Sequence, residues 1–198
     1  MSTQTHTENI RSTFDSQGKT IRIGCASAFW GDTETAASQL VEKGNIDYLV
    51  FDYLAEITMS IMAGQKMKNP QLGYAVDFVK TTMAPLLADI KAKGIKVISN
   101  AGGVNPQACR DALQQVADTA GVELKIAVVN GDNILSKKND YQAQGIVEMN
   151  TGATMPPMFV SMNAYLGAPG VVTALEADAD IIITGRVVDS AVVLGALV

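Results

Sequence analysis

Five short, β-branched-rich segments set the strongest limit on how this chain can fold. Their nearly continuous apolar character is typical of strands buried on both faces, as in parallel sheets. The predicted strands span residues 21–26, 48–52, 95–100, 124–130 and 180–184. Helical patterns lie at residues 33–43, 55–66, 73–93, 105–120, 170–177 and 187–197. Strands that alternate with helices along the chain are joined by right-handed crossovers. This order predicts an α/β fold: an open, mostly parallel sheet of at least five strands with helices on both faces.

Proline and glycine residues mark where the predicted helices begin, break and end. Pro85 lies inside the 73–93 segment and predicts a kink or a break there. Gly94 and Gly121 follow two of the helical patterns, and glycine commonly ends a helix because it adopts the left-handed conformation readily. Asn105 is a candidate N-cap, and proline follows it at the first helical position.

Charge and hydropathy exclude several classes of function. The 198 residues carry a formal net charge of −5, with no run of lysine or arginine to provide the basic surface that nucleic acid needs. No apolar stretch approaches the roughly 18 residues of a membrane-spanning helix. Residues 1–19 are polar and lack the apolar core of a signal peptide. We therefore expect a disordered tail over 1–19, a folded domain over 20–198, a cytoplasmic location, and no nucleic-acid or membrane partner.

The chain has few of the side chains that nucleophilic catalysis and transition-metal sites use most. Its only histidine, His6, lies in the expected tail, which argues against a Ser–His or Cys–His pair and against a histidine-ligated zinc site. Cys25 and Cys109 are expected to be free thiols rather than a disulfide. Because Cys25 lies within a predicted strand, we expect it to be a small buried apolar residue.

The carboxyl ends of parallel strands meet at one edge of a sheet, where ligands bind in open α/β folds. The segments that follow the five predicted strands are rich in small and polar residues, and we expect the ligand-binding site there. The candidate ligand-binding residues are Ser27, Trp30, Gly31, Asn100, Gly102, Gly103, Asn105, Asp132, Gly185 and Arg186.

Several of these residues have a simpler structural alternative. Gly102 and Gly103 form either an anion cradle, in which a phosphate or carboxylate meets backbone N–H groups, or a turn that needs positive φ. Arg186 either clamps an anion or pairs with Asp189, three residues further along the predicted helix. Trp30 either floors a pocket or packs in the core. Neither a GxGxxG nor a GxxxxGK motif supports a dinucleotide or P-loop site.

Carboxylates near the same edge are the candidate proton-transfer groups, since no histidine is available there. The candidate catalytic residues are Asp32, Asp52, Glu56 and Asp189. Such oxygen ligands also suit Mg²⁺, although the sequence singles out no set of metal ligands. For Asp32 and Asp132 the simpler alternative is a helix N-cap.

The segment 132–169 interrupts the alternation of strands and helices. It contains Met149, Met155, Met158 and Met162 together with several glycines and prolines. A loop of this length inside a compact domain is usually functional or disordered, and its apolar content argues against disorder. It is expected to act as a lid, as the wall of an apolar ligand pocket, or as an oligomer contact.

Several stretches resemble the acyclic terpene utilisation (AtuA) family. They are residues 21–33 (IRIGCASAFWGDT), 46–61 (IDYLVFDYLAEITMSI), 97–106 (VISNAGGVNP), 164–175 (AYLGAPGVVTAL) and 183–197 (ITGRVVDSAVVLGAL). These motifs are co-linear and span nearly everything after the tail. Members of the family are generally longer, which implies that residues 20–198 form an α/β domain truncated at its C-terminal end.

The resemblance implies a part in the breakdown of citronellol- and geraniol-type acids as CoA thioesters. We expect an enzyme or enzyme component that acts on a branched acyl-CoA or carboxylic acid in a lyase- or hydratase-like step. The expected ligand is a small acyl or CoA molecule, and Mg²⁺ is the candidate cofactor. The expected protein partners are either further copies of the chain or further family domains. The alternative is a non-catalytic binding or assembly subunit of a catabolic complex.

Overall fold

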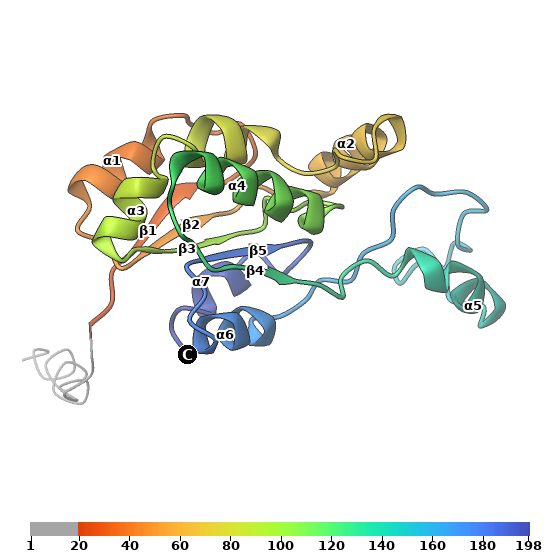
Figure 1. Cartoon of the computed structure of the whole chain (residues 1–198). Coiled ribbons are helices and arrows are strands. Elements are labelled where there is room, and N and C mark those ends of the chain that lie inside the picture. The colour runs from red at the N-terminus through yellow and green to blue at the C-terminus, as the bar shows by residue number, and fades with distance from the viewer. Residues whose placement is uncertain (1–19) are drawn as a thin grey trace, which may run out of the picture.

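The computed structural model describes residues 20–198, and a parallel sheet of five strands forms its centre (Figure 1). The tail expected at residues 1–19 lies outside the described residues. The strands are β1 (Ile23–Ser27), β2 (Tyr48–Phe51), β3 (Lys96–Ser99), β4 (Ile126–Val129) and β5 (Ile181–Thr184). They lie in the order β1-β2-β3-β5-β4, and all neighbouring pairs are parallel. The predicted open α/β sheet is confirmed.

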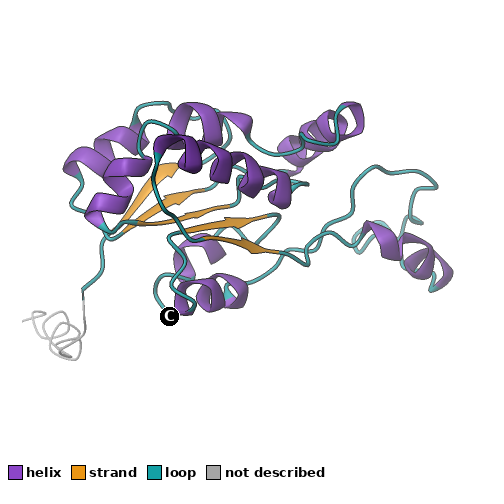
Figure 2. Cartoon of the chain, in the orientation of Figure 1, coloured by secondary structure: helices purple, strands orange, loops and turns teal. Residues whose placement is uncertain are grey.

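Helices cover both faces of the sheet (Figure 2). The face at the top of Figure 1, called the upper face, carries α1 (Ala36–Lys43), α2 (Glu56–Lys68), the π-helical turn η1 (Phe78–Met83), α3 (Leu87–Lys93) and α4 (Pro106–Ala120). The lower face carries α6 (Pro169–Glu176) and α7 (Ala191–Leu194). Within residues 20–198, no helix combines the length and the apolar character needed to span a lipid bilayer.

Alternate side chains of each central strand enter two separate hydrophobic cores. In β5, Ile181 and Ile183 pack in the core under the upper helices, whereas Ile182 packs in the core against the lower helices. Leu49 and Val50 of β2 are divided between the two cores in the same way. Because successive side chains of a strand point to opposite faces and both faces are covered here, the central positions of these strands are apolar in succession, whereas polar residues such as Lys96, Ser99 and Thr184 lie at strand ends.

The proline and glycine signals correspond to helix ends. Gly94 and Gly121 adopt the left-handed conformation just after α3 and α4, with φ angles of 66° and 67°. Pro85 lies between η1 and α3, so the break expected within the 73–93 segment is confirmed. These features depend on local backbone preferences, which is why the sequence reveals them.

Two local predictions are wrong because long-range packing overrides them. The helix expected over 187–197 is confined to α7; it lacks its first turn because the Val188 N–H donates to the Leu166 carbonyl (2.8 Å) and holds this part of the chain extended. Cys25 is exposed rather than buried. It lies on the edge strand β1, whereas α7 packs beneath β2 and β3, and α6 beneath β4 and β5.

The strand order creates a topological switch between β3 and β5. From β3 the chain continues into α4 on the upper face, whereas from its neighbour β5 it continues into α7 on the lower face. Connections that leave adjacent strands towards opposite faces open a crevice beyond the carboxyl ends of those strands, and ligands bind there. The topology therefore places the expected ligand-binding site beyond the carboxyl ends of β3 and β5.

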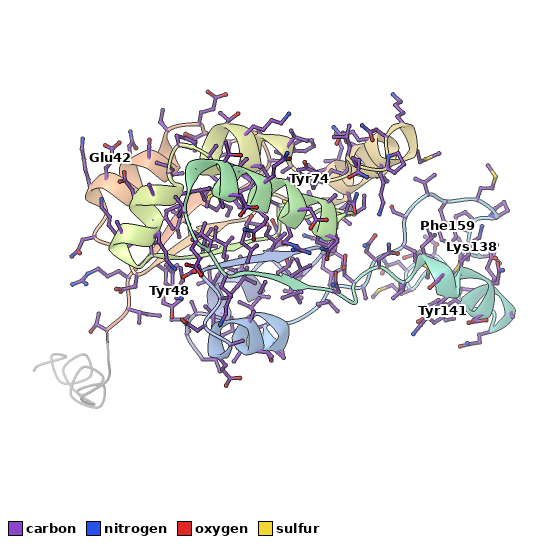
Figure 3. All side chains as sticks on the ribbon, viewed as in Figure 1. Glu42, Tyr48, Tyr74, Lys138, Tyr141 and Phe159 are labelled. Carbon is purple, nitrogen blue, oxygen red and sulfur yellow. The ribbon has the colours of Figure 1, made fainter. Side chains whose placement is uncertain are left out.

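Residues 133–165 extend beyond the carboxyl-end edge of the sheet and form a projecting segment, here called the arm (Figure 1). Its helical elements are η2 (Leu135–Lys137) and α5 (Lys138–Ala143). At the base of the arm, Asn133 and Asn163 form an antiparallel bridge. Further out, the Lys138 ammonium nitrogen lies 4.8 Å from the centroid of the Phe159 ring, and Figure 3 shows both side chains there. The rest of the described chain is called the body.

Candidate functional site

Arg186 lies at the centre of a polar cluster just beyond the end of β5. Its side chain is 5% exposed. Its Nη1 donates to the Leu54 carbonyl oxygen at 2.7 Å and to Asp189 Oδ1 at 3.0 Å. The ion pair with Asp189 matches one of the two alternatives for Arg186, although both residues precede α7. The buried Nε has no hydrogen-bond partner among the described residues, so the protein does not satisfy every donor of the guanidinium.

Tyr165, at the end of the arm, covers the guanidinium. The Cζ atom of Arg186 lies 4.1 Å from the centroid of the Tyr165 ring, which is a cation–π contact. The Tyr165 hydroxyl donates a hydrogen bond to the carboxylate of Glu56, the first residue of α2. Glu56 Oε1 also lies 3.9 Å from Arg186 Nη2. The Tyr165 hydrogen bond is the main reason that the pKa of the exposed Glu56 carboxyl lies below its usual value.

Asp52 and Asn100 form the part of the cluster that follows β2 and β3. Asn100 Nδ2 donates to Asp52 Oδ1 at 2.7 Å, and Asn100 Oδ1 accepts from the Tyr53 N–H at 2.6 Å. Burial raises the pKa of the Asp52 carboxyl above its ordinary 3.8; the Asn100 hydrogen bond lowers it, and the charge of Asp189 raises it again. A carboxyl group with a raised pKa beside a buried arginine suits proton transfer.

Asp132 connects the base of the arm to the cluster. Its Oδ2 accepts from the Arg186 backbone N–H and from Asn163 Nδ2, both at 2.8 Å. This buried carboxylate is not a helix cap, which was its simpler alternative. A Cβ atom at Gly185 would collide with the Asp132 carboxylate, so only glycine permits this close approach. Asp132 also lines a cavity of about 680 Å³, within the range of about 300–1,000 Å³ typical of small-molecule sites.

Gly102 and Gly103 are packed inside the fold. The Gly102 N–H donates to the Thr184 carbonyl at 3.1 Å, and the Gly103 N–H donates to the Asn100 carbonyl at 3.3 Å. Gly103 has a φ of 55°, and a side chain there would collide with the Met62 sulfur. The positive φ of Gly103 matches the turn, and the internal hydrogen bonds of both glycines exclude the anion cradle, because a cradle needs free N–H groups.

The residues after β1 mostly bond within their own loop. Asp32 Oδ2 accepts from the Ala28 N–H at 3.0 Å, so Asp32 closes this loop and does not cap α1. Gly31 and Asp32 line a small cavity of about 80 Å³. Two residues reach the segment after β2: the hydroxyl of Ser27, the last residue of β1, donates to the Asp52 carbonyl at 3.4 Å, and the Trp30 backbone N–H donates to the Tyr53 carbonyl at 3.2 Å. Asp32 therefore contributes no contact to the Arg186 cluster.

Two other candidate ligand-binding side chains are engaged in internal hydrogen bonds. Trp30 Nε1 donates to Asp77 Oδ1 at 2.6 Å, and the indole packs against the upper core, which matches the core-packing alternative. Asn105 precedes Pro106 at the start of α4 but makes no side-chain cap. Its Nδ2 donates instead to the carbonyl oxygens of Pro70 and Leu72, so it ties the loop before η1 to the N-terminal end of α4.

Comparison with protein families supports the resemblance over the whole folded part of the chain. The family model described as "Acyclic terpene utilisation family protein AtuA" matches residues 21–198. The chain belongs to the acyclic terpene utilisation (AtuA) family. No curated protein matches it. The family resemblance expected from the motifs is confirmed, and membership connects the chain with the utilisation of acyclic terpenes.

In this member of the AtuA family, only part of the predicted site comes together. The predicted residues that meet are Asp52, Glu56, Asn100, Asp132, Gly185, Arg186 and Asp189. Sequence reasoning misses Tyr165 and Asn163, because no periodic pattern places side chains within the 132–169 segment. The one usable signal is the family-like stretch 164–175, which includes Tyr165.

Carboxylates are numerous in the cluster, but they do not converge on one point. Among residues 20–198, no three histidine, cysteine, aspartate or glutamate side chains are grouped as a metal ion would need. Asp52 is bonded to an amide group, Glu56 to a hydroxyl group, and Asp189 to Arg186. The groups available for chemistry are therefore the buried guanidinium of Arg186 and the carboxyl of Asp52, whose pKa is raised.

Proposed function

We propose that this chain is an enzyme, or an enzyme component, that acts on a branched acyl-CoA or a related branched carboxylic acid. The step would be lyase- or hydratase-like. The observation that carries the proposal is that burial raises the pKa of the Asp52 carboxyl at the edge of the sheet where the buried Arg186 also lies. Membership of a family named for acyclic terpene utilisation supports the substrate class.

In this proposal Asp52 moves the proton. The hydrogen next to a thioester carbonyl is acidic, and a carboxylate with a raised pKa is a stronger base than an ordinary one. Asn100 fixes the orientation of Asp52 through its 2.7 Å hydrogen bond. The positive charge of Arg186 stabilises the negative charge that develops on the carbonyl oxygen as the proton leaves. Gly102 and Gly103 have no part in this scheme, because their N–H groups are bonded internally.

Hydrogen exchange at the substrate tests this assignment without knowledge of the complete reaction. The protein is incubated in D₂O with a branched acyl-CoA, and mass spectrometry follows deuterium at the carbon next to the carbonyl. Asp52→Asn is expected to slow exchange by about 10²–10⁴-fold, as for loss of a general base. Asp89→Asn, on the exposed first turn of α3, is the matched control and should exchange as the wild type does.

The pH dependence gives a second readout of the same assignment. Exchange should rise with pH as Asp52 loses its proton, with a midpoint above the ordinary carboxyl value of 3.8. A folded wild-type protein that exchanges no deuterium with any branched acyl-CoA would rule out the proton-transfer role. Exchange that survives in Asp52→Asn would assign the base to another residue.

A non-catalytic assembly subunit is the second candidate function, and the arm favours it. Met149 and Met158 of the arm are 91% and 85% exposed. Exposed apolar side chains on a projecting segment are typical of contacts with another protein surface. Light scattering of the wild type and of a Met149→Ser/Met158→Ser double variant tests this candidate. A drop in mass confined to the variant would support assembly through the arm, and identical masses would count against it.

A further inference from the structure

Two adjoining cavities lie where the arm meets the body. The larger has a volume of about 680 Å³ and the smaller about 170 Å³. Both are lined by Lys66, Val104, Asn133 and Leu135, so they share a boundary. We call them together the cleft. Its wall includes residues of α2, the start of α4 and the base of the arm, so both regions of the molecule are needed to form it.

The two chambers of the cleft share part of their lining and differ in the residues that each contributes alone. The larger presents hydrogen-bonding side chains, among them Gln107, Asn130 and Ser136. The smaller presents the aliphatic or thioether side chains of Met67 and Val160, which are 70% and 52% exposed and thus have apolar surface to cover. Such a pairing of surfaces fits a ligand that is polar at one end and aliphatic at the other.

Lys66 lies at the boundary of the two chambers and carries a positive charge there. Its Nζ donates to the Val104 carbonyl oxygen at 2.8 Å, which uses one of the three ammonium donors. Among the described residues, no carboxylate lies within 4.0 Å of this nitrogen, whereas Lys91 and Lys96 each have such a partner. The remaining donors of Lys66 are therefore available to an anionic ligand group.

The cleft is connected to the Arg186 cluster through two residues. Asp132 lines the larger chamber and Asn163 lines the smaller one. Asn163 Nδ2 and the Arg186 backbone N–H both donate to Asp132 Oδ2. The Asp132 carboxylate would repel an anion placed against it, which favours the Lys66 boundary as the position of the anionic group.

We propose that Lys66 is the anion-binding residue of this cleft, which takes an acid with an aliphatic chain: the anionic oxygens at Lys66, the chain against Met67 and Val160. This inference rests on the proposed function and deepens it by assigning the substrate-binding residue. The anion is a carboxylate if the ligand is the free acid, or a phosphate if the ligand is its CoA thioester. No sequence pattern singles out Lys66, which lies on a helix with one other lysine, Lys68.

Binding measurements with four probes test the proposal. Calorimetry on the full chain compares a branched medium-chain carboxylic acid, its uncharged primary amide, its CoA thioester, and CoA alone. The wild type should bind the acid or the thioester at least about tenfold more tightly than the amide, as expected for a charge-assisted hydrogen bond. Preference for the free acid assigns a carboxylate to Lys66, whereas binding of CoA that the acyl chain strengthens assigns a phosphate. Equal binding of the thioester and of CoA would overturn the placement of the chain against Met67 and Val160.

Variants then assign the effect to the lysine. Lys66→Met keeps the aliphatic stem but removes the charge, and it should lose about tenfold or more of the affinity for the anionic probe. Lys66→Arg should restore part of that affinity. Lys68→Met, a neighbour on α2 that lines neither chamber, is the matched control and should bind as the wild type does. Thermal unfolding of each variant checks that the fold is retained.

The outcomes separate this inference from the proposed function. Equal affinity of the wild type and Lys66→Met for the anionic probe overturns the role of Lys66, and so does a wild type that binds none of the four probes. Deuterium exchange that depends on Asp52 would then still support the proposed function. Conversely, Lys66-dependent binding without Asp52-dependent exchange would support the cleft and overturn the proton-transfer role.

Discussion

In the body, Phe51, Ile98 and Ile182 are at most 1% exposed, whereas in the arm neither η2 nor α5 has a buried residue. The body therefore derives its stability from apolar area removed from water, at about 25 cal/mol per Å². The arm depends on hydrogen bonds and local contacts, each with a small net free energy in exposed positions. Segments with little apolar burial open more easily than the core. This difference matters because the arm supplies Tyr165 and Asn163 to the site.

Local capping replaces a core at the tip of the arm. The Glu148 carboxylate accepts from the backbone N–H groups of Asn150 and Thr151 and from the Thr151 hydroxyl. Lys138 donates to the Pro157 carbonyl across the arm at 2.6 Å. These contacts order the arm without anchoring it to the sheet. Its attachment to the body depends on a few groups near the base, including Tyr165 and Asp132.

The largest contrast is expected between two isoleucines. Ile182→Ala removes a fully buried side chain from the lower core, and its free energy of unfolding should fall by about 2–5 kcal/mol. Ile146→Ala in the arm, where the side chain is 44% exposed, should change it by no more than about 0.5 kcal/mol. Urea unfolding measures both. Equal losses would mean that the arm shares the stability of the core.

A second contrast compares two glycines with positive φ. An alanine at Gly103 would meet the Met62 sulfur and, at 2.7 Å, the Gly73 carbonyl oxygen. We expect about 1–3 kcal/mol of overpacking in addition to a left-handed backbone cost of roughly 1–2 kcal/mol. Gly152→Ala in the arm should show only the backbone cost, since its φ is 68° and no atom lies within 4 Å. Urea unfolding measures the loss of unfolding free energy in each variant, and the difference between Gly103→Ala and Gly152→Ala gives the cost of overpacking. Equal losses would argue against the tight turn.

The attachment of the arm should weaken when the Tyr165 hydroxyl is removed. Tyr165→Phe keeps the ring over Arg186 but loses the hydrogen bond to Glu56, with an expected cost of about 0.5–1.5 kcal/mol at most. Limited proteolysis within the arm should become faster, while urea unfolding of the body changes little. Tyr141→Phe, on α5 (Figure 3), is the matched control. Equal cleavage rates in the two variants would contradict a role for Tyr165 in attachment.

The smallest effect concerns the pH dependence of the arm tip. Hydrogen bonds from Thr151, side chain first and then backbone, lower the pKa of the exposed Glu148 carboxyl from 4.5 to about 2. Because the folded pKa is depressed, the stabilisation is complete above pH 4.5 and is lost as the pH falls through about 2. Backbone amide signals of Asn150 and Thr151 should report this opening by NMR. Glu148→Gln should remove the pH dependence, and a carboxyl that titrates near 4.5 would exclude the capping.

The sequence predicts the site residues that lie close to a strand end, but not the contacts between residues far apart in the chain. Asp52 and Asn100 directly follow β2 and β3, and Arg186 follows β5 after one glycine; parallel strands bring such positions to one edge in any order. The contact between Tyr165 and Glu56 joins residues 109 apart, and that between Arg186 and Leu54 joins residues 132 apart. No short-range pattern encodes either contact. Only the packed structure decides between an anion cradle and a turn for Gly102 and Gly103, and between a pocket floor and core packing for Trp30. The same local sequence is compatible with either alternative.

The sequence by itself determined the five strands, the helices between them apart from η2 and α5, the break at Pro85 and the family of the chain. These features follow from local causes: side-chain periodicity, backbone restriction and co-linear motifs. Only the tertiary structure decided that β5 lies between β3 and β4. That order leaves Cys25 exposed at the edge, places the switch at Arg186, and brings the arm to α2. Strand order depends on apolar surface buried jointly by segments far apart in the chain, and no single segment carries that information.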